Sequence, residues 1–366
     1  MKTYLFITDT DFKDSKLTGA HKRYLELLRG VSKNNKIILV SSENPQIKDL
    51  ANIIFYEIKK SKLKLPSHVC GMIELCSVLR KIKSKIQYDY AISFSASNTI
   101  CYWACGFNNI TTLLREDIIE YQKVLKASSV RLKYFVFQEH LAVIASKKII
   151  VQCKNDKNNL IVRNEKYCKN IKDKVFLQIN NVNASWIKSE YREQYNTDNR
   201  IKILFVGEFS DDRKGHSILI PAVAKLMEEM ENFILYVAGD GVQLEKYKNN
   251  FAEYHGIVFL GRVNNLQEYY SMCDFEVVPS LIDSCPNTVL EGLNAGIAVY
   301  GSNRGGIPDL LLEEKYLFEP NVDSLYLFLK DIIKNKRYRN DAIDQIKRKK
   351  ELSFNWCDKI QNIIEN

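Results

Sequence analysis

The feature that most constrains the fold is an alternation of short apolar stretches with helical patterns, which occurs in both halves of the chain. Parallel sheets with crossover helices produce this alternation, because each strand is buried on both faces and each return connection is a helix. The stretches expected as strands are residues 4–8, 36–41, 90–94, 111–114, 148–152, 175–179, 203–206, 233–238, 258–260 and 275–278. We therefore predict an α/β fold built from doubly wound domains.

Length and polarity predict where the domains divide. The chain has 366 residues, and a single hydrophobic core rarely grows beyond about 250 to 300 residues. A polar stretch near residues 180–200 separates the two runs of alternation. We predict an N-terminal domain (1–180), a hinge (181–200), a second domain (201–350) and a C-terminal helix (351–366) that returns toward the first domain.

Composition excludes several classes of protein. The nine cysteines are scattered and form no C-x-x-C pair, which predicts free, mostly buried thiols in a reducing cytosol and no metal site. No stretch reaches the roughly 18 to 20 apolar residues of a membrane span, and residues 1–9 look like a strand rather than a signal peptide. We expect a cytoplasmic protein whose membrane contact, if it occurs, is peripheral and on the cytoplasmic face. The charge of +9 fits an anionic substrate, an acidic membrane surface, nucleic acid or merely a Lys-rich solvated surface.

The stretch 279–309 carries the residues best suited to chemistry. A strand ends in a Pro-Ser turn, a loop follows, and residues 288–295 have helical spacing. Asp283 lies in the loop, and Glu291, eight positions later, lies about one turn inside the helix. Both carboxylates are therefore expected to face the mouth of one cleft.

The start of this helix lies between the two carboxylates. We predict Asn287 or Thr288 as its N-cap. Backbone N–H groups at a helix start point toward a ligand, and the helix dipole favours negative charge there. The segment expected to bind a phosphate or a sugar hydroxyl is Ser284, Cys285, Pro286, Asn287 and Thr288. Residues 305–308, Gly-Gly-Ile-Pro, predict a second helix start of the same kind on the neighbouring strand.

The order of residues in 279–309 resembles the acid, seven residues, acid signature of the retaining GT-B glycosyltransferases of family 4 (glycosyl transferases group 1), followed by that family's G-G-x-P-acid turn. Two acids at this spacing are common by chance, so the resemblance depends on the Pro-Ser turn, the A-V-Y strand and the G-G-I-P turn in sequence. It implies a GT-B fold, with two Rossmann-like domains facing across a cleft. It also implies transfer of a sugar, with retention of configuration, from a UDP- or GDP-linked donor to a glycan or lipid-linked acceptor. Such an enzyme belongs to the hexosyltransferases (EC 2.4), requires no cofactor or metal, and serves bacterial surface polysaccharide or glycoconjugate assembly.

The resemblance also implies roles for individual residues. Lys214, with Arg213, would meet the donor diphosphate, and Glu291 would bind the ribose hydroxyls. A lysine at a helix start opposes the helix dipole, which suggests an anion between the two. The remaining contacts implied are Asp283 and residues 284–287 on the sugar, Arg262 and Val263 on the base, and Gly19 in the first loop. Lys214, Asp283 and Glu291 are the residues that we expect to be catalytic.

The sequence departs from the family pattern at three places. Glu208 stands where many members have an arginine, and Arg213 is the candidate to supply the missing charge. Asp283 replaces the usual glutamate, and its shorter side chain puts the identity of the sugar in doubt more than the activity. The glycine pair of the first loop is reduced to Gly19-Ala20.

Residues 59–85 of the first half combine basic and apolar residues. The resemblance places the acceptor in this half, so the segment predicts contact with anionic lipid headgroups. An ordinary surface helix with a buried face would have the same pattern. The basic residues are Lys59, Lys60, Lys62, Lys64, Arg80, Lys81, Lys83 and Lys85. In the same half, Arg115, Glu116 and Asp117 are expected near the cleft, and His140 is expected to be structural.

Three other functions remain open from sequence. A nucleotide-sugar epimerase or hydrolase shares this architecture but needs acid and base groups in the cleft. A non-catalytic glycan-binding homologue is compatible with Glu208 and Asp283. A nucleic-acid-binding protein would explain the charge, but no motif for nucleic acid is present, and we expect no nucleic-acid partner.

Overall fold

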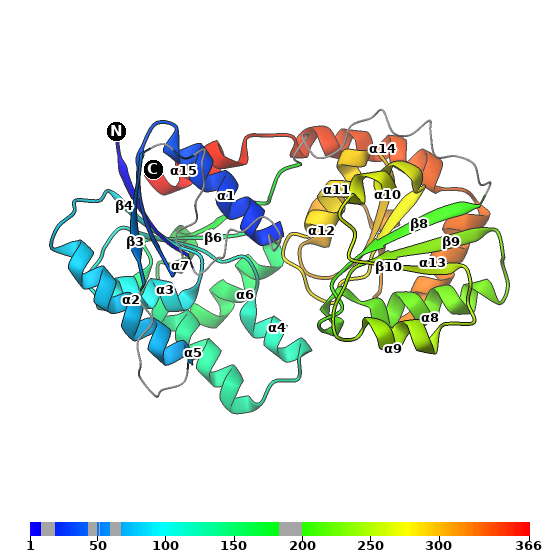
Figure 1. The fold of residues 1–366 in the computed structure, drawn as a ribbon, viewed down its shortest axis with the longest axis horizontal. Coiled ribbons are helices and arrows are strands. Elements are labelled where there is room, and N and C mark those ends of the chain that lie inside the picture. Colours follow the sequence, from blue (N-terminus) through cyan, green and yellow to red (C-terminus); the bar gives the residue numbers. More distant parts are fainter. Residues whose placement is uncertain (9–18, 43–49, 51, 59–66, 183–199) are drawn as a thin grey trace. The chain divides into compact units, whose positions relative to one another are not determined.

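The computed structural model describes residues 1–8, 19–42, 50, 52–58, 67–182 and 200–366 (Figure 1). The chain divides into two compact units. Unit 1 consists of Met1–Ile119, Ser128–Ile179 and Asn355–Asn366, and unit 2 consists of Glu120–Ala127 and Asn180–Phe354. This division differs from the predicted boundaries in two places. A short segment of the first half joins unit 2, and residues 351–354 belong to unit 2 because the helix that ends there packs on its sheet. Most of the predicted hinge, residues 183–199, lies outside the described residues.

Unit 1 is a seven-stranded parallel sheet in the order β3-β2-β1-β4-β5-β6-β7. Its strands are β1 (Thr3–Thr8), β2 (Lys36–Ser41), β3 (Ile53–Glu57), β4 (Tyr90–Ser93), β5 (Ile110–Leu113), β6 (Lys148–Val151) and β7 (Val175–Leu177). Its helices are α1 (Gly19–Ser32), α2 (Ser67–Lys83), α3 (Ala96–Ala104), α5 (Ser129–Ala145), α6 (Lys154–Asn164), α7 (Ile171–Lys174) and α15 (Trp356–Glu365), and α4 (Ile118–Val124) lies mostly in unit 2.

Strand β1 shows why the sheet of unit 1 needs helices on both faces. Successive side chains of a strand point to opposite faces. Leu5 and Ile7 join the core formed with α2 and α3. On the other face, the ring of Phe6 contacts that of Tyr24 in α1, and the hydroxyl of Tyr4 donates to Glu365 in α15. An apolar strand without polar alternation therefore becomes the centre of a two-faced core.

The last helix completes unit 1. In α15, Trp356, Ile360 and Ile364 are buried. The ammonium group of Lys148 in β6 donates to the carbonyl oxygens of Ile363 and Ile364 at 2.6 and 3.0 Å. A cation at a helix C-terminus is stabilised by the unpaired carbonyl groups there. Residues from both ends of the described sequence are thus parts of one core.

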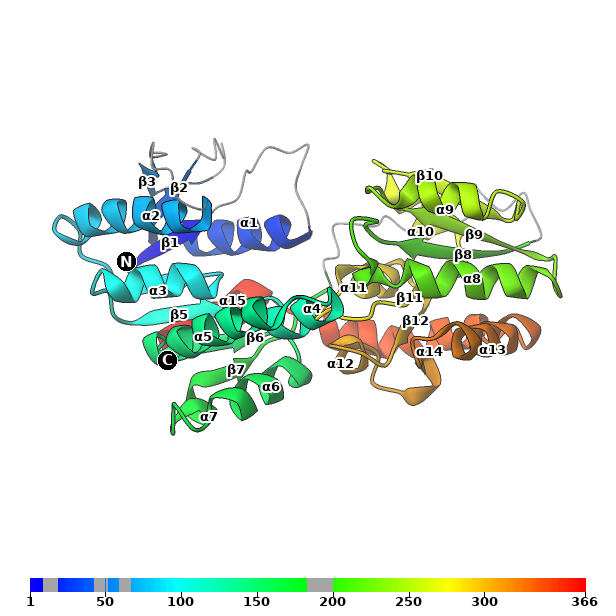
Figure 2. The ribbon, with the colours of Figure 1, turned by 90° about the horizontal axis from the view of Figure 1, so that it is seen from below.

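Unit 2 is a six-stranded parallel sheet in the order β10-β9-β8-β11-β12-β13, with α10 and α11 on one face and α8 and α13 on the other (Figures 1 and 2). Its strands are β8 (Ile201–Val206), β9 (Phe233–Ala238), β10 (Ile257–Gly261), β11 (Phe275–Val278), β12 (Ala298–Ser302) and β13 (Leu317–Phe318). Its helices are α8 (His216–Met227), α9 (Leu244–Asn250), α10 (Leu266–Met272), α11 (Asn287–Ala295), α12 (Ile307–Leu311), α13 (Val322–Lys334) and α14 (Tyr338–Leu352), with 3-10 turns η4 (Asp212–Lys214) and η5 (Glu314–Tyr316).

The two sheets confirm the predicted α/β fold of two doubly wound domains. All nine cysteines are free thiols, and seven of them are buried, as the sequence predicts. Among the described helices, none combines the length and the apolarity that crossing a bilayer requires.

The segment expected to contact lipid, 59–85, is described only from Ser67 onward, where it forms α2. Leu75, Leu79 and Ile82 of this helix are buried in the core of unit 1. That part of its apolar face is therefore not available to a membrane, whereas its basic residues Arg80, Lys81 and Lys83 are exposed. Contact with lipid stays a prediction.

Candidate active site

Four loops at one edge of the second sheet form the candidate site. All pairs of strands in this sheet are parallel, so the loops after β8, β9, β10 and β11 leave from the same edge. Backbone hydrogen bonds join these loops directly. The N–H of Gly207 donates to Ala238 at 3.0 Å, and that of Gly239 donates to Gly261 at 2.8 Å. The side chains carried by these loops therefore have defined relative positions, at the edge where parallel sheets bind ligands.

Lys214 is the last residue of the turn η4, between β8 and α8. Asp211 caps this turn, because its Oδ1 accepts a hydrogen bond from the N–H of Arg213 at 2.8 Å. Gly215 follows in the left-handed conformation, with φ of 74°, and begins α8. This conformation is unfavourable for residues that have a Cβ atom. The sequence Asp-Asp-Arg-Lys-Gly thus encodes a capped turn that ends at a glycine in the left-handed conformation.

The same turn packs against the loop that follows β11. A Cβ atom on Gly215 would lie 2.0 Å from the carbonyl oxygen of Pro279, so only glycine allows this approach. The N–H of Leu281 donates to the carbonyl oxygen of Arg213 at 2.8 Å. These contacts bring Lys214 to the loop that carries Asp283.

Lys214 and Asp283 form an ion pair, with 2.6 Å between Nζ and Oδ2. Arg213 lies farther away, with 3.8 Å between its guanidinium and the same oxygen. The other carboxylate oxygen of Asp283 accepts from the N–H of Cys285 at 3.3 Å, and its carbonyl oxygen accepts from the N–H of Gly306 at 2.8 Å. The side chains of the pair are 17% and 14% exposed, so a lysine of defined orientation lies at this edge of the sheet.

Helix α11 begins one residue earlier than the predicted caps allow. Pro286 occupies the N-cap position, with no side-chain cap, and Asn287 is the first helical residue. The prediction that Asn287 or Thr288 is the N-cap is therefore wrong. A proline has no N–H to leave unpaired, and its restricted φ is compatible with the extended backbone of an N-cap, here with φ of −62° and ψ of 122°. The side-chain oxygens of Asn287 and Thr288 are buried and have no hydrogen-bond partner among the described residues, and Glu291 lies one turn into the helix.

Glu291 belongs to a cluster with two residues that sequence reasoning missed. The hydroxyl oxygen of Tyr270 in α10 lies 3.3 Å from Oε2 of Glu291 and 3.0 Å from Oε1 of Glu276 in β11. Glu276 is fully buried. Burial raises the pKa of Glu276 well above its ordinary value, and the charge of Glu291 raises it further. A glutamate inside an otherwise apolar strand was the signal that could have found this cluster.

The raised pKa predicts a pH-dependent cost of burying Glu276. A carboxyl group whose pKa is higher in the folded state contributes a stability that falls as the pH rises above its unfolded pKa, about 4.3. Glu276→Gln should therefore raise the melting temperature more at pH 8 than at pH 5. Thermal unfolding across this range tests the prediction, with Glu208→Gln, a change at an exposed glutamate of unit 2, as control for the lost charge. A gain that is equal at both pH values would contradict it.

The remaining predicted contact residues have different surroundings. Ser284 and Cys285 are buried in the loop between Asp283 and α11. Arg262 is exposed and Val263 half-buried, directly after β10 at the same edge of the sheet. Gly19 is the first residue of α1 in unit 1, and the rest of its loop, residues 9–18, lies outside the described residues.

Tyr121 is a further residue of the site region that sequence reasoning missed. It lies in α4, in the segment of the first half that joins unit 2. Its hydroxyl donates to Oδ2 of Asp211 at 2.8 Å, and the guanidinium of Arg213 lies over its ring, 5.8 Å from the centroid. The turn that carries Lys214 is thus supported by a residue some ninety positions away in sequence, which no local pattern indicates.

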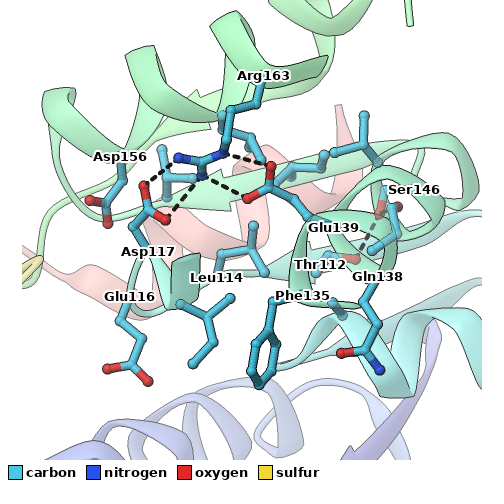
Figure 3. Close-up of a pocket in the computed structure, with 17 residues that line it drawn as sticks. Thr112, Leu114, Glu116, Asp117, Phe135, Gln138, Glu139, Ser146, Asp156 and Arg163 are labelled. Atoms are coloured by element: carbon cyan, nitrogen blue, oxygen red, sulfur yellow. Dashed lines mark hydrogen bonds and ion pairs between the residues drawn. The ribbon is translucent and has the colours of Figure 1, made fainter. Parts of the chain in front are cut away.

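Unit 1 contains a second charged cluster, whose members form ion pairs with one another. Figure 3 shows Arg163 between the carboxylates of Asp117 and Glu139, with contacts of 2.7 to 3.0 Å. Burial alone would lower the pKa of Arg163, but the hydrogen bonds and charges of the two carboxylates raise it above its ordinary value. Asp117, expected near the cleft, is therefore committed to an ion pair, and the adjacent cavity of about 40 Å³ has room for little more than water.

Unit 1 also contains a cavity of about 940 Å³ between α2, α3 and α5. It lies beside the ends of β2 and β3 and the start of α3, since Ser42, Ile58 and Ser97 line it. Most of the surface of the wall is apolar, and about half of the lining residues carry polar side chains. Its larger lining side chains are Met72, Glu74, Leu75, Arg131, Tyr134 and Phe135. This combination is typical of sites for small or amphiphilic ligands.

Comparison with known proteins identifies the second unit. Residues 187–349 match the family model described as glycosyl transferases group 1. The chain carries a glycosyl transferases group 1 domain. It is a glycosyltransferase, as the resemblance predicted, and its two sheets form the GT-B fold.

Two relatives and one solved structure are similar to parts or the whole of the chain. Protein CapJ of Staphylococcus aureus is 26% identical over 326 residues, which cover 86% of this chain and 73% of the relative. The O-antigen biosynthesis glycosyltransferase WbnH of Escherichia coli is 29% identical over 143 residues, which cover 39% of this chain and 40% of WbnH. The structure of Anabaena HepE in complex with UDP and glucose covers 100% of both chains, with a TM-score of 0.74 and 13% identity. This last likeness shows the fold alone.

Proposed function

We propose that the protein is a retaining glycosyltransferase that transfers a sugar from a UDP- or GDP-linked donor to a glycan or lipid-linked acceptor, in bacterial surface polysaccharide or glycoconjugate assembly. The observation that carries the proposal is the Lys214–Asp283 ion pair of 2.6 Å, beside a helix start that leads to Glu291. The names of WbnH, an O-antigen biosynthesis enzyme, and of HepE, solved with UDP and glucose, agree with this class of donor and pathway.

In the proposed reaction, Lys214 binds the diphosphate of the donor. Negative charge grows on the leaving diphosphate as the sugar bond breaks, and a fixed cation in a partly buried site stabilises that charge without reorganising. Asp283 holds the ammonium group of Lys214 in place before the donor binds. Arg213, 3.8 Å from the same carboxylate, supplies a second positive charge. No metal ion is needed in this scheme.

Asp283 and the backbone of residues 284–287 then hold the sugar, and the carboxylate of Glu291 accepts two hydrogen bonds from the ribose diol. The leaving phosphate takes the proton of the acceptor hydroxyl on the same face, which retains the anomeric configuration. A protein nucleophile is not required.

The acceptor side of the proposal rests on the cavity of about 940 Å³ in unit 1. An apolar wall suits a lipid or the apolar face of a sugar, while Arg131 and Glu74 can orient a polar group. We place the acceptor there, with contact to anionic lipid through the exposed basic residues of α2.

A panel of UDP- and GDP-sugars tests the function. One donor at about 100 times its Kd should stabilise the protein by about 2.7 kcal/mol, which raises the melting temperature by roughly 5 to 10 °C for a unit of this size. Incubation of that donor with glycan and lipid-linked acceptors, followed by NMR of the anomeric carbon, should then give a product with the configuration of the donor.

Other outcomes distinguish the alternatives. Conversion of the donor without any acceptor would indicate an epimerase or hydrolase. Binding without turnover would indicate a non-catalytic glycan-binding homologue, and no shift with any donor would contradict the proposed site.

A further inference from the structure

Glu276 is an unusual residue for its place in the fold. It lies in β11, Phe275–Val278, whose residues are all buried, and its two neighbours in the strand are apolar. An ionised carboxylate in such a place loses its hydration and needs compensating partners. One oxygen of Glu276 contacts Tyr270, while Oε2 has no hydrogen-bond partner among the described residues. Burying an acid with one unsatisfied oxygen lowers the stability of the fold. The presence of Glu276 in this strand therefore suggests a role in function.

The hydroxyl group of Tyr270 connects Glu276 to the site. Its oxygen lies 3.0 Å from Oε1 of Glu276, 3.3 Å from Oε2 of Glu291 and 3.5 Å from the carbonyl oxygen of Thr288. A phenol has one hydrogen to donate, and its oxygen can accept another. If both carboxyl groups were ionised, the single hydrogen of the phenol could serve only one of its two contacts with Glu276 and Glu291. The other contact would then bring two oxygen atoms together without a hydrogen between them. A proton on Glu276 removes this conflict, because Glu276 then donates to Tyr270, and Tyr270 donates to Glu291.

The pKa directions agree with this assignment of protons. Burial raises the pKa of Glu276, and the charges and hydrogen bonds of both glutamates add to the effect of burial on Tyr270, whose pKa is also well above its ordinary value. The groups facing Glu276 are Tyr270 in α10, Glu291 in α11 and Lys214 in η4. The charge of Lys214 lowers the pKa of Glu276, as does its hydrogen-bond contact with Tyr270, but burial dominates.

Helix α11 has a glycine at the position that faces Glu276. A Cβ atom on Gly292, the residue after Glu291, would lie 2.4 Å from Oε2 of Glu276 and 2.6 Å from a methyl group of Val299. Only a residue without a side chain lets α11 lie this close to the strand. In this arrangement the hydroxyl oxygen of Tyr270 lies 3.3 Å from Oε2 of Glu291.

We propose that Glu276, in its protonated form, and Tyr270 are positioning residues that orient the Glu291 carboxylate toward the vicinal diol of the donor nucleoside. The inference rests on the proposed function, in which Glu291 binds that diol. A glutamate side chain has considerable rotational freedom, and fixing it before the ligand arrives removes an entropic cost of binding. In this proposal neither residue touches the donor itself.

The test compares nucleoside diphosphates with and without the diol. The probes are UDP and GDP and their 2′,3′-dideoxy counterparts, and the readout is the ratio of dissociation constants from calorimetry. For the base that binds, the parent protein should prefer the ribose form by about tenfold or more, since hydrogen bonds to a charged group are strong. Tyr270→Phe and Glu276→Leu should each reduce this ratio to about threefold or less, close to the value of Glu291→Ala.

Two controls separate positioning from a general loss of packing. Glu276→Gln keeps a donor toward Tyr270 and should restore the preference for ribose. The preference of the parent should fall at high pH, where Glu276 loses its proton, whereas that of Glu276→Gln should not. Tyr300→Phe removes a buried hydroxyl that donates to Asp341 at 2.6 Å and should leave the ratio unchanged. Melting temperatures confirm folding, and if Glu276→Leu does not fold, Tyr270→Phe and the pH profile decide.

The outcomes distinguish this inference from the function on which it rests. If Glu291→Ala loses the preference while Tyr270→Phe and Glu276→Leu keep it, the positioning role is wrong and the proposed donor site stands. If the parent protein binds neither nucleotide, or binds both forms equally, the proposed role of Glu291 fails, and the inference fails with it.

Discussion

Replacing Lys214 with alanine is expected to lower kcat/KM for the donor by about 10² to 10³-fold. Loss of one fixed electrostatic contact to a developing negative charge typically has an effect of this size. The ion pair of 2.6 Å with Asp283 holds the ammonium group before the donor arrives. The entropy of orienting the lysine side chain is therefore lost on folding and not on donor binding. Release of nucleoside diphosphate, with the donor found in the panel, measures the effect.

Lys225→Ala is the matched control for Lys214→Ala. Lys225 lies in α8 of the same unit, is 47% exposed, and pairs with Asp323 at 2.8 Å. An exposed pair of this kind contributes little to stability, and the residue is not part of the proposed site. Both variants should melt within a few degrees of the parent. Equal activity of the two variants would remove Lys214 from the mechanism.

Gly215→Ala is expected to lower the stability of unit 2 by about 3 kcal/mol or more. Two costs add. The residue has φ of 74°, where a Cβ atom costs roughly 1 to 2 kcal/mol. The added Cβ would also lie 2.0 Å from the carbonyl oxygen of Pro279, so the turn or the loop after β11 must move. Thermal unfolding should show a decrease of roughly 6 to 12 °C for a unit of this size.

Gly296→Ala separates the two costs. Gly296 ends α11 with φ of 73°, and a Cβ there would meet nothing within 4 Å. It should therefore show only the conformational cost, roughly 1 to 2 kcal/mol, which lowers the melting temperature by less than the substitution at Gly215 does. The substitution at Gly215 should also reduce donor binding, because it displaces Lys214 from Asp283, whereas that at Gly296 should not. Similar melting temperatures for the two variants would show that the contact with Pro279 is not tight.

The sequence predicted β8, β9 and β11 of unit 2 well because nearly all of their residues are buried, so each strand is an apolar run. β9 and β11 begin and end at the predicted residues, and β8 and β10 differ by one or two residues at their ends. The loop with Asp283 and the helix with Glu291 could be predicted because a strand, a turn and a helix follow one another in the sequence. The start of α11 was not, since Asn and Thr are common caps and the proline before them was read as part of the loop.

The residues that sequence reasoning missed depend on contacts between distant elements. Tyr121 reaches Asp211 across ninety positions, and no periodicity encodes such a contact. Glu276 is an acid within an apolar strand of the sequence, but no pattern in the sequence singles out its partner Tyr270 in α10. Pairing between an interior acid and a phenol requires the packing of a helix on a sheet, which local patterns do not specify.

Completion of unit 1 by α15 has a consequence for how the protein is made. During synthesis, the sheet of unit 1 leaves the ribosome first, but α15, whose Glu365 accepts a hydrogen bond from Tyr4 of β1, is translated only after all of Asn180–Phe354. At about 5 to 20 residues per second, this delay is roughly 9 to 35 s. The nascent first unit therefore waits with an uncovered apolar surface while the second unit folds, and a chaperone has that interval in which to act.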